Sequence, residues 1–173
     1  MTASIAVFGS SRADETGPDY PNAFEIGREI ARRGGRIVCG GGGGIMEAVC
    51  RGTAEAGGRS LGVVIGDAAP NRWVTDVVRE ADLAARLRRL RDESSAAIFL
   101  PRGLGTMLEL AWMVESVVKG EIAPRPLVFL GLFWRRAVAL ALTEAAGPGA
   151  DALAKCIRFA NSPIEAVEEA YRA

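Results

Sequence analysis

The chain has 173 residues with 21 basic and 21 acidic side chains, so its formal net charge is zero. A chain of this length is typical of a single domain that buries its core without disulfides or metals, and its neutrality excludes a general attraction to nucleic acid or anionic membranes. Histidine is absent, which excludes Ser-His-Asp and Cys-His catalysis and leaves no Cys/His metal cluster to propose. We therefore expect residues 1–173 to form one domain.

Strand and helix patterns alternate along the whole chain. Strands are predicted at residues 4–8, 36–39, 60–65, 96–100 and 126–130, with less defined candidates at 73–78 and 156–159. Helical patterns follow Pro21 and begin near residues 45, 81, 106, 133 and 163, and glycine pairs or the Gly147–Gly149 break end several of them. The last helix should open with Ser162 as cap and Pro163 as its first residue. This alternation predicts a doubly wound α/β fold, a parallel sheet with helices on both faces.

The cysteines and the hydropathy pattern predict a cytoplasmic location. Cys39, Cys50 and Cys156 show no C-x-x-C spacing and lie in apolar stretches, as reduced packing residues do. No apolar run reaches the roughly 18 residues that a membrane span needs, and the first residues lack the pattern of a signal peptide. We expect a soluble protein with no membrane partner.

Three loops rich in small residues follow predicted strands, at residues 9–11, 40–44 and 102–106. Loops at the carboxyl ends of neighbouring parallel strands meet in one crevice, where small residues let the backbone approach a ligand closely. A single glycine run has a plainer explanation, because tight strand-to-helix turns need glycine whatever binds there. The third loop opens a helix, whose first N–H groups suit a phosphate.

The common nucleotide fingerprints are missing. No G-x-x-x-x-G-K-[ST] occurs, and residues 40–46 fail to fit G-x-G-x-x-G because Ile45 stands at the last position. Neither a P-loop NTPase nor a conventional dinucleotide enzyme is indicated. The pattern favours a mononucleotide or sugar-phosphate pocket of a different design.

The residues after the strand at 96–100 resemble a known signature. Residues 101–109 read Pro-Arg-Gly-Leu-Gly-Thr-Met-Leu-Glu, similar to the P-G-G-x-G-T-x-x-E of the Lonely Guy (LOG) family, long described as lysine decarboxylases. Residues 9–11 look like that family's G-S-S loop, residues 40–49 resemble its second glycine loop, and Arg86 matches the arginine of its R-K pair. The resemblance extends over most of the chain, from Ile5 to Ala170.

This resemblance implies a Rossmann-like homodimer that hydrolyses the N-glycosidic bond of a nucleoside 5′-monophosphate, either a cytokinin riboside monophosphate or an AMP-like compound. Its partner would be this small molecule rather than a nucleic acid polymer, and no cofactor or metal is implied. The catalytic pair would be Glu109 and Arg86. The resemblance implies that the phosphate is bound by Gly103, Gly105, Thr106 and Arg102. It implies that the nucleotide pocket is lined by Gly9, Ser10, Ser11, Gly41, Gly42, Gly43 and Met46.

The chemistry suits those residue types. Breaking a glycosidic bond develops oxocarbenium character on the ribose, which a carboxylate can stabilise while it orients water. Arginine is always charged and can hold the departing base or the phosphate, but it is a poor proton donor.

Two residues depart from the LOG pattern and leave alternatives open. Arg102 replaces the glycine at the second residue of the signature, and it would either add a phosphate contact or point to solvent. Leu87 replaces the lysine of the R-K pair, and it would equally complete an apolar face with Leu83 and Leu90. Both changes allow a binding protein that does not cleave its ligand, such as a molybdenum cofactor carrier or a nucleotide sensor.

Other interpretations compete at the level of single residues. Thr106 and Glu109 fit a capping box, in which the glutamate stabilises the helix start instead of acting on a ligand. Arg86 could be a solvated residue on a basic helix face. A pyridoxal-phosphate decarboxylase is disfavoured, because the two lysines, Lys119 and Lys155, lie outside the three loops. The apolar stripe after the motif favours core and consists of Trp112, Met113, Val117 and Val118. In the dimers of the LOG family the corresponding helix lies near the partner, so the resemblance implies that part of this stripe belongs to a dimer interface.

Overall fold

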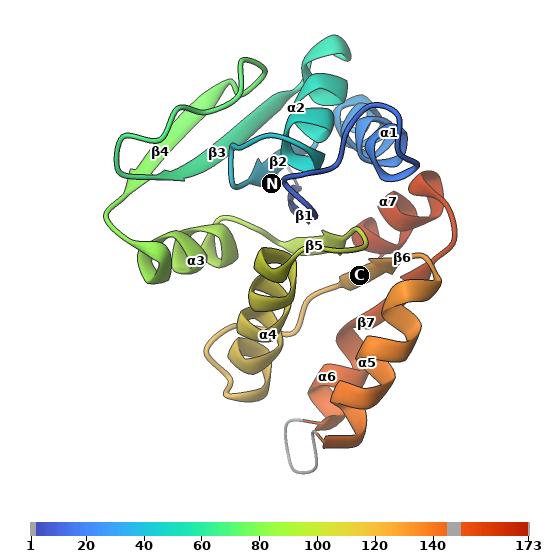
Figure 1. The fold of residues 1–173 in the computed structure, drawn as a ribbon. Helices are drawn as coiled ribbons and strands as arrows, with labels where there is room; N and C mark the ends of the chain where they lie inside the picture. Colours follow the sequence, from blue (N-terminus) through green and yellow to red (C-terminus); the bar gives the residue numbers. More distant parts are fainter. Residues whose placement is uncertain (1–2, 145–149, 173) are drawn as a thin grey trace.

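The computed structural model describes residues 3–144 and 150–172. Its strands are β1 (Ser4–Phe8), β2 (Arg36–Cys39), β3 (Arg59–Ile65), β4 (Asp76–Glu80), β5 (Ala96–Phe99), β6 (Leu127–Leu130) and β7 (Ile157–Ala160). They form one sheet in the order β4-β3-β2-β1-β5-β6-β7, and every neighbouring pair is parallel (Figure 1). The chain first moves outward from β1 to β4, then crosses back to β5. The predicted doubly wound sheet is therefore confirmed, and its order reverses between β1 and β5.

The central strand is β1, which pairs with β2 along one edge and β5 along the other. Ile5 lies opposite Ile37 on β2 and Ala96 on β5. Both neighbours and both faces are covered, so a continuous apolar run fits this position better than an alternating one. The last residue, Phe8, stacks on Phe99 of β5 with ring centroids 5.1 Å apart, which fixes the carboxyl ends of the two strands beside each other.

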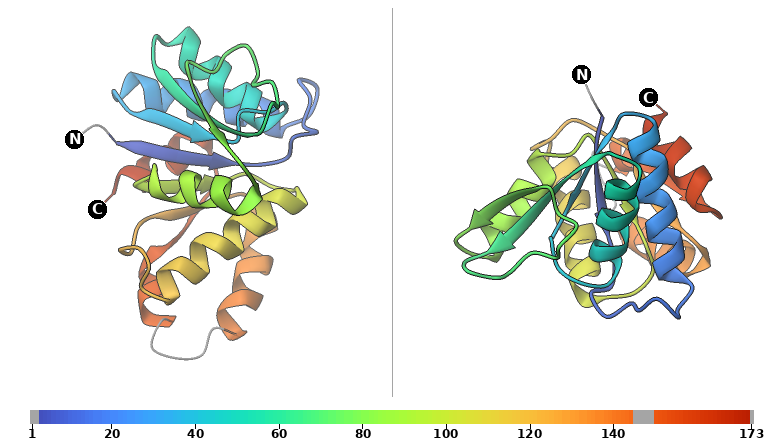
Figure 2. Two further views of the ribbon diagram at one scale, coloured as in Figure 1. Left: turned by 90° about the vertical axis from the view of Figure 1, so that its left-hand side faces the viewer. Right: turned by 90° about the horizontal axis from the view of Figure 1, so that it is seen from above.

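Helices cover both faces of the sheet, as predicted (Figure 2). The helices are α1 (Asp19–Arg32), α2 (Ile45–Glu55), α3 (Leu83–Asp92), α4 (Leu104–Val118), α5 (Leu132–Glu144), α6 (Ala150–Cys156) and α7 (Pro163–Tyr171). One core lies between the sheet and helices α1, α2 and α7. The second lies on the opposite face, under α3, α4, α5 and α6. No helix of the described residues is long and apolar enough to cross a membrane.

Several element boundaries differ from the prediction. Helix α1 begins at Asp19, so Pro21 lies in its first turn instead of preceding it. Proline is tolerated there because the backbone N–H groups of the first turn have no partner within the helix. Strand β4 covers Asp76–Glu80 rather than residues 73–78. Helix α6 was missed because seven residues are too short to show a helical period. The Gly147–Gly149 break lies outside the described residues.

The predicted start of α7 is confirmed. Ser162 is its N-cap and its side-chain oxygen accepts a hydrogen bond from the Glu165 backbone N–H at 3.2 Å, with Pro163 in the first helical turn. The three cysteines are free and buried, with Cys39 and Cys50 sulfurs 3.5 Å apart. Both results agree with the expectations from sequence.

Candidate functional site

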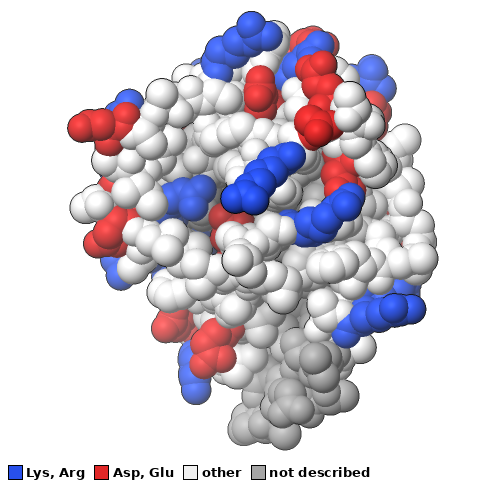
Figure 3. Space-filling model, in the orientation of Figure 1, with Lys and Arg blue, Asp and Glu red and all other residues white. Residues whose placement is uncertain are grey.

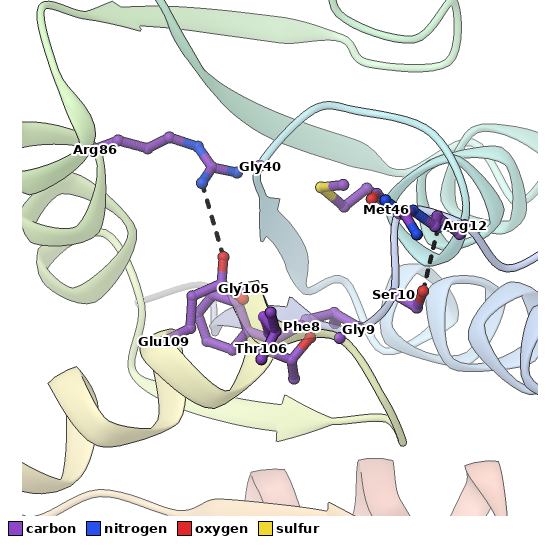
Figure 4. Close-up of a pocket in the computed structure, with 14 residues that line it drawn as sticks. Phe8, Gly9, Ser10, Arg12, Gly40, Met46, Arg86, Gly105, Thr106 and Glu109 are labelled. Atoms are coloured by element: carbon purple, nitrogen blue, oxygen red, sulfur yellow. Dashed lines mark hydrogen bonds and ion pairs between the residues drawn. The ribbon is translucent and has the colours of Figure 1, made fainter.

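A pocket of about 620 Å³ opens at the carboxyl ends of β1, β2 and β5, where the strand order reverses (Figure 4). Ligands of doubly wound sheets bind at such a reversal, because the loops on its two sides diverge and leave a crevice. The lining residues are Val7, Phe8, Gly9, Ser10, Ser11, Arg12, Gly40, Met46, Arg86, Gly103, Leu104, Gly105, Thr106 and Glu109. The three small-residue loops thus contribute to one pocket.

Most of the site residues expected from sequence line this pocket, and four do not belong to its lining: Gly41, Gly42, Gly43 and Arg102. The carbonyls of Gly41 and Gly42 instead accept hydrogen bonds from the Asn71 side chain at 3.2 Å and 2.8 Å. The second glycine loop therefore contributes through Gly40 and Met46. Sequence reasoning missed Val7, Phe8 and Arg12, although Arg12 directly follows the G-S-S loop, and it included Gly40 only as part of the loop at residues 40–44.

The first and second loops are tied together at Gly44. Its φ of +66° favours glycine, and a Cβ there would lie 2.4 Å from the carbonyl oxygen of Ser10. The same Ser10 carbonyl accepts a hydrogen bond from the Ile45 N–H at 3.0 Å. This contact requires the two loops to approach closely and fixes one wall of the pocket.

Helix α4 starts inside the pocket. Gly103 is its N-cap, so the N–H groups of its first turn have no carbonyl partner within the helix and carry the positive end of the helix dipole. Thr106 lies in this turn, is 1% exposed and lines the pocket (Figure 4). Its Oγ1 has no hydrogen-bond partner among the described residues. An uncompensated buried hydroxyl is costly, so this atom is suited to a bound anion.

The capping-box interpretation of Thr106 and Glu109 is wrong. It required Thr106 to be the N-cap, but Gly103 holds that place and no side chain caps the helix. Thr106 is the third residue of α4 and Glu109 lies in its second turn. The glutamate is therefore released from a local structural role, and its side chain points toward Arg86 (Figure 4).

Glu109 is buried within the pocket wall. Its side chain is only 11% exposed, and its Oε1 lies 3.8 Å from Nη1 of Arg86. Burial raises its pKa from 4.5 to about 7, and the nearby positive charge of Arg86 opposes that rise. The carboxyl group can therefore exist in both protonation states close to neutral pH, as acid-base and electrostatic roles require.

Arg86 reaches the pocket from α3. Leu87 and Leu90 of this helix are buried and hold it against the sheet, so Leu87 is a core residue, whereas Leu83 is 45% exposed. The Arg86 side chain is 16% exposed, and its Nε donates a hydrogen bond to the Val63 carbonyl at 2.8 Å. The interpretation of Arg86 as a solvated residue is wrong; exposed Arg88 fits that description.

Arg102 turns away from the main pocket. Its guanidinium pairs with Asp19 at 2.7 Å, its side chain is 65% exposed, and it lines a neighbouring cavity of about 280 Å³. Among the described residues it alone has a positive φ without being glycine, +70°. A left-handed conformation costs a non-glycine residue roughly 1–2 kcal/mol. The loop thus keeps the backbone shape that suits glycine while carrying an arginine.

Charges are mixed on the face shown in Figure 3, where basic and acidic side chains are interspersed. No uniform electrostatic potential of one sign therefore extends over the described residues of this face to attract an anion. The groups at short range are the α4 N-terminus, the unpartnered Thr106 hydroxyl and the Arg86 guanidinium.

Thr106→Val is expected to weaken the binding of a phosphate-bearing ligand in this pocket about 10- to 100-fold, the value of a hydrogen bond to a charged group, without lowering the melting temperature. Stability should hold because the hydroxyl has no protein partner to lose. Isothermal titration with AMP and thermal unfolding would measure both quantities. The matched control is Thr53→Val: the Thr53 hydroxyl donates to the Val49 carbonyl at 2.8 Å, so this variant should melt lower and bind normally. Equal affinity of Thr106→Val and wild type would contradict the anion site.

Comparison with known proteins places these features in a family context. A family model described as the SLOG cluster4 family matches residues 2–119. The chain is 32% identical over 115 residues to the "Probable cytokinin riboside 5′-monophosphate phosphoribohydrolase LOGL1" of Oryza sativa subsp. japonica, covering 64% of this chain and 52% of that protein. It is 31% identical over 111 residues to LOGL5 of the same plant, which carries the same description, covering 61% and 45%. The chain spans about half the length of these curated relatives.

The molybdenum cofactor carrier protein MCP of Chlamydomonas reinhardtii has a similar solved structure. The TM-score is 0.77 at 24% identity, and the match covers 97% of this chain and 95% of the carrier. At this identity the likeness shows a shared fold, and it extends over regions that the plant relatives do not match.

Proposed function

The chain belongs to the SLOG cluster4 family of LOG-like proteins, and from this premise we propose that it hydrolyses the N-glycosidic bond of a nucleoside 5′-monophosphate to free base and ribose 5-phosphate. The observation that carries the proposal is the pairing of buried Glu109 with Arg86 at 3.8 Å, in the same pocket as the unpartnered Thr106 hydroxyl. A phosphate bound at Thr106 would thus lie next to the Glu109–Arg86 pair, where the glycosidic bond would break.

In this proposal the phosphate accepts hydrogen bonds from the first-turn amides of α4 and from Thr106. The ribose then extends toward Glu109, which lies one turn further along the same helix. As the bond between C1′ and the base nitrogen breaks, its electron pair leaves with the base and C1′ gains positive character. The Glu109 carboxylate stabilises that charge and orients the attacking water.

Protons and charges balance without a cofactor. Water adds its oxygen to C1′, Glu109 accepts the proton that the water loses, and a proton finally reaches the departing base. Arg86 remains charged throughout and stabilises the electron pair on the base. Because the Glu109 pKa is about 7, the carboxylate is available near neutral pH and can pass its proton on.

A carrier that does not cleave its ligand is the second candidate. Leu87 stands where the LOG pattern has lysine, and the chain is similar over 97% of its length to a molybdenum cofactor carrier. Such a carrier would use the same pocket for a phosphate-bearing pterin. The position of Glu109 opposite Arg86 favours hydrolysis over this alternative.

Incubation of the protein with a panel of nucleoside 5′-monophosphates, including AMP and cytokinin riboside monophosphates, tests the two candidates. We expect the appearance of free base and ribose 5-phosphate in equal amounts, measured by chromatography and a sugar-phosphate assay. The matching nucleosides without phosphate serve as controls and should react far more slowly. If no base is released although the protein binds a nucleotide or pterin phosphate tightly, hydrolysis is excluded and the carrier function stands.

We further propose that two copies associate through the outer side of α4. Leu104, which also lines the pocket, is 91% exposed, and Met107 and Leu108 are about 40% exposed, so this helix presents contiguous apolar surface. A second copy could cover these side chains. We also propose that the protein is cytoplasmic, because its buried cysteines are free thiols, as is usual for proteins of a reducing compartment.

Leu108→Glu is expected to shift the protein from dimer to monomer, because it places a charge in the apolar surface. Light scattering coupled to size exclusion would report twice the mass of one chain for wild type and a single mass for the variant. Ile164→Glu, on distant helix α7 and 49% exposed, is the control and should leave the mass unchanged. A monomeric wild type would refute the association.

A further inference from the structure

Gly40 occupies a place where any side chain would displace the ends of two neighbouring side chains, Arg86 and Met46. It directly follows β2, is buried and lines the pocket. A Cβ at this position would lie 1.7 Å from Nη2 of Arg86 and 2.8 Å from the sulfur of Met46. Its φ does not fall in the left-handed region, so this glycine is required for space rather than for backbone conformation.

We propose that Gly40 is a positioning residue for Arg86, and that its bare Cα is the surface on which the guanidinium rests. The Val63 carbonyl holds Nε of the same group at 2.8 Å. With Nε bound and Nη2 against Gly40, the remaining Nη1 is the nitrogen 3.8 Å from Glu109 (Figure 4). The catalytic meaning of this arrangement rests on the proposed hydrolysis, whereas the contact itself does not.

Fixing the guanidinium matters because arginine has a long, flexible side chain. Left free, it would populate several rotamers, and only some would face Glu109. Two backbone groups outside α3, the Val63 carbonyl on β3 and the Gly40 Cα just after β2, remove that freedom before a ligand arrives. Preorganised charges of this kind are more effective than charges that must reorient during a reaction.

Displacing the guanidinium should also change the titration of Glu109. Arg86 lowers the pKa of this carboxyl group, in opposition to burial. In Gly40→Ala the guanidinium must move, so the pKa of Glu109 should rise. A substitution that merely loosened the loop would have no reason to shift this value.

A double-mutant cycle tests the proposal, using wild type, Gly40→Ala, Arg86→Ala and the double variant. In the wild-type background, Gly40→Ala should lower the melting temperature by at least about 3 °C and lower the turnover about 10- to 100-fold. It should also shift the rising limb of the pH profile of turnover to higher pH. In the Arg86→Ala background the same change should cost almost nothing, because the atom that the Cβ meets is gone. The Met46 sulfur remains in both backgrounds and can move cheaply.

The outcomes separate this proposal from the proposed function. Equal losses of melting temperature in both backgrounds would overturn the role of Gly40, whether or not the protein is a hydrolase. A strongly non-additive cycle in a protein that hydrolyses nothing would retain the role of Gly40 and reject the hydrolysis. If Gly40→Ala fails to fold, folding of the double variant supports the proposal, and failure of both variants to fold overturns it.

Discussion

Glu109→Gln is expected to lower the rate of nucleoside monophosphate hydrolysis by a factor of about 10² to 10⁴, the usual contribution of a positioned acid-base group. Glutamine has nearly the same shape, so the pocket should keep its form and its affinity for the phosphate. It cannot, however, carry the negative charge that stabilises the oxocarbenium ion, nor accept a proton from water. Turnover and AMP affinity, measured together, distinguish these effects. A variant with full turnover would remove Glu109 from the mechanism.

The same substitution should make the folded protein more stable above pH 7. The folded pKa of Glu109 is about 7 against an ordinary value of 4.5, so the folded state holds this proton more tightly than the unfolded state. Its stabilising effect is complete below about pH 4.5 and is lost as the pH rises through 7, a change of about 3 kcal/mol. Glutamine does not ionise and avoids that loss.

Urea unfolding of both proteins at several pH values between 5 and 8 measures this difference. The free energy of unfolding of the Glu109→Gln variant relative to wild type should increase across the range, with the larger advantage at pH 8. Gain of stability together with loss of activity is the pattern expected when a buried charge serves function rather than folding. A variant that is less stable than wild type at pH 8 would contradict the assigned pKa.

Arg86→Ala is expected to lower the turnover about 100-fold and to shift the pH dependence. Activity should rise with pH as the Glu109 carboxylate forms. Because the positive charge of Arg86 lowers the pKa of Glu109, its removal should move this rise to higher pH. The expected result is therefore a larger deficit at pH 7 than at pH 9.

The matched control is Arg88→Ala, two residues along the same helix. Arg88 is exposed, so its removal changes the net charge equally without touching the pocket, and its pH profile should overlay that of wild type. If both variants shift the profile by the same amount, the effect comes from overall charge and not from the contact between Arg86 and Glu109.

Much of the fold follows from local patterns that the sequence displays directly. The run Ile5–Phe8 is apolar throughout, which fits a strand buried on both faces, and together with Ser4 it forms β1 with the predicted bounds. Ser162 and Pro163 predict the start of α7, because helix capping depends on contacts within four residues. The convergence of the three loops on one pocket was also predictable from the sequence, because the alternation of strands and helices places all three loops at the same edge of the sheet.

The sequence by itself determined the class of fold, the family signature and the residue types available for chemistry. The tertiary structure alone decided what each of these residues contacts. Thr106 and Glu109 have the spacing of a capping box, yet Gly103 is the N-cap of the helix, so both side chains are left for the pocket. Arg102 sits in the phosphate signature but pairs with Asp19, and Gly40 lies against Arg86, 46 positions further along the chain. These contacts join residues far apart in sequence, so their distances depend on how the whole sheet folds, and no local period or motif encodes them.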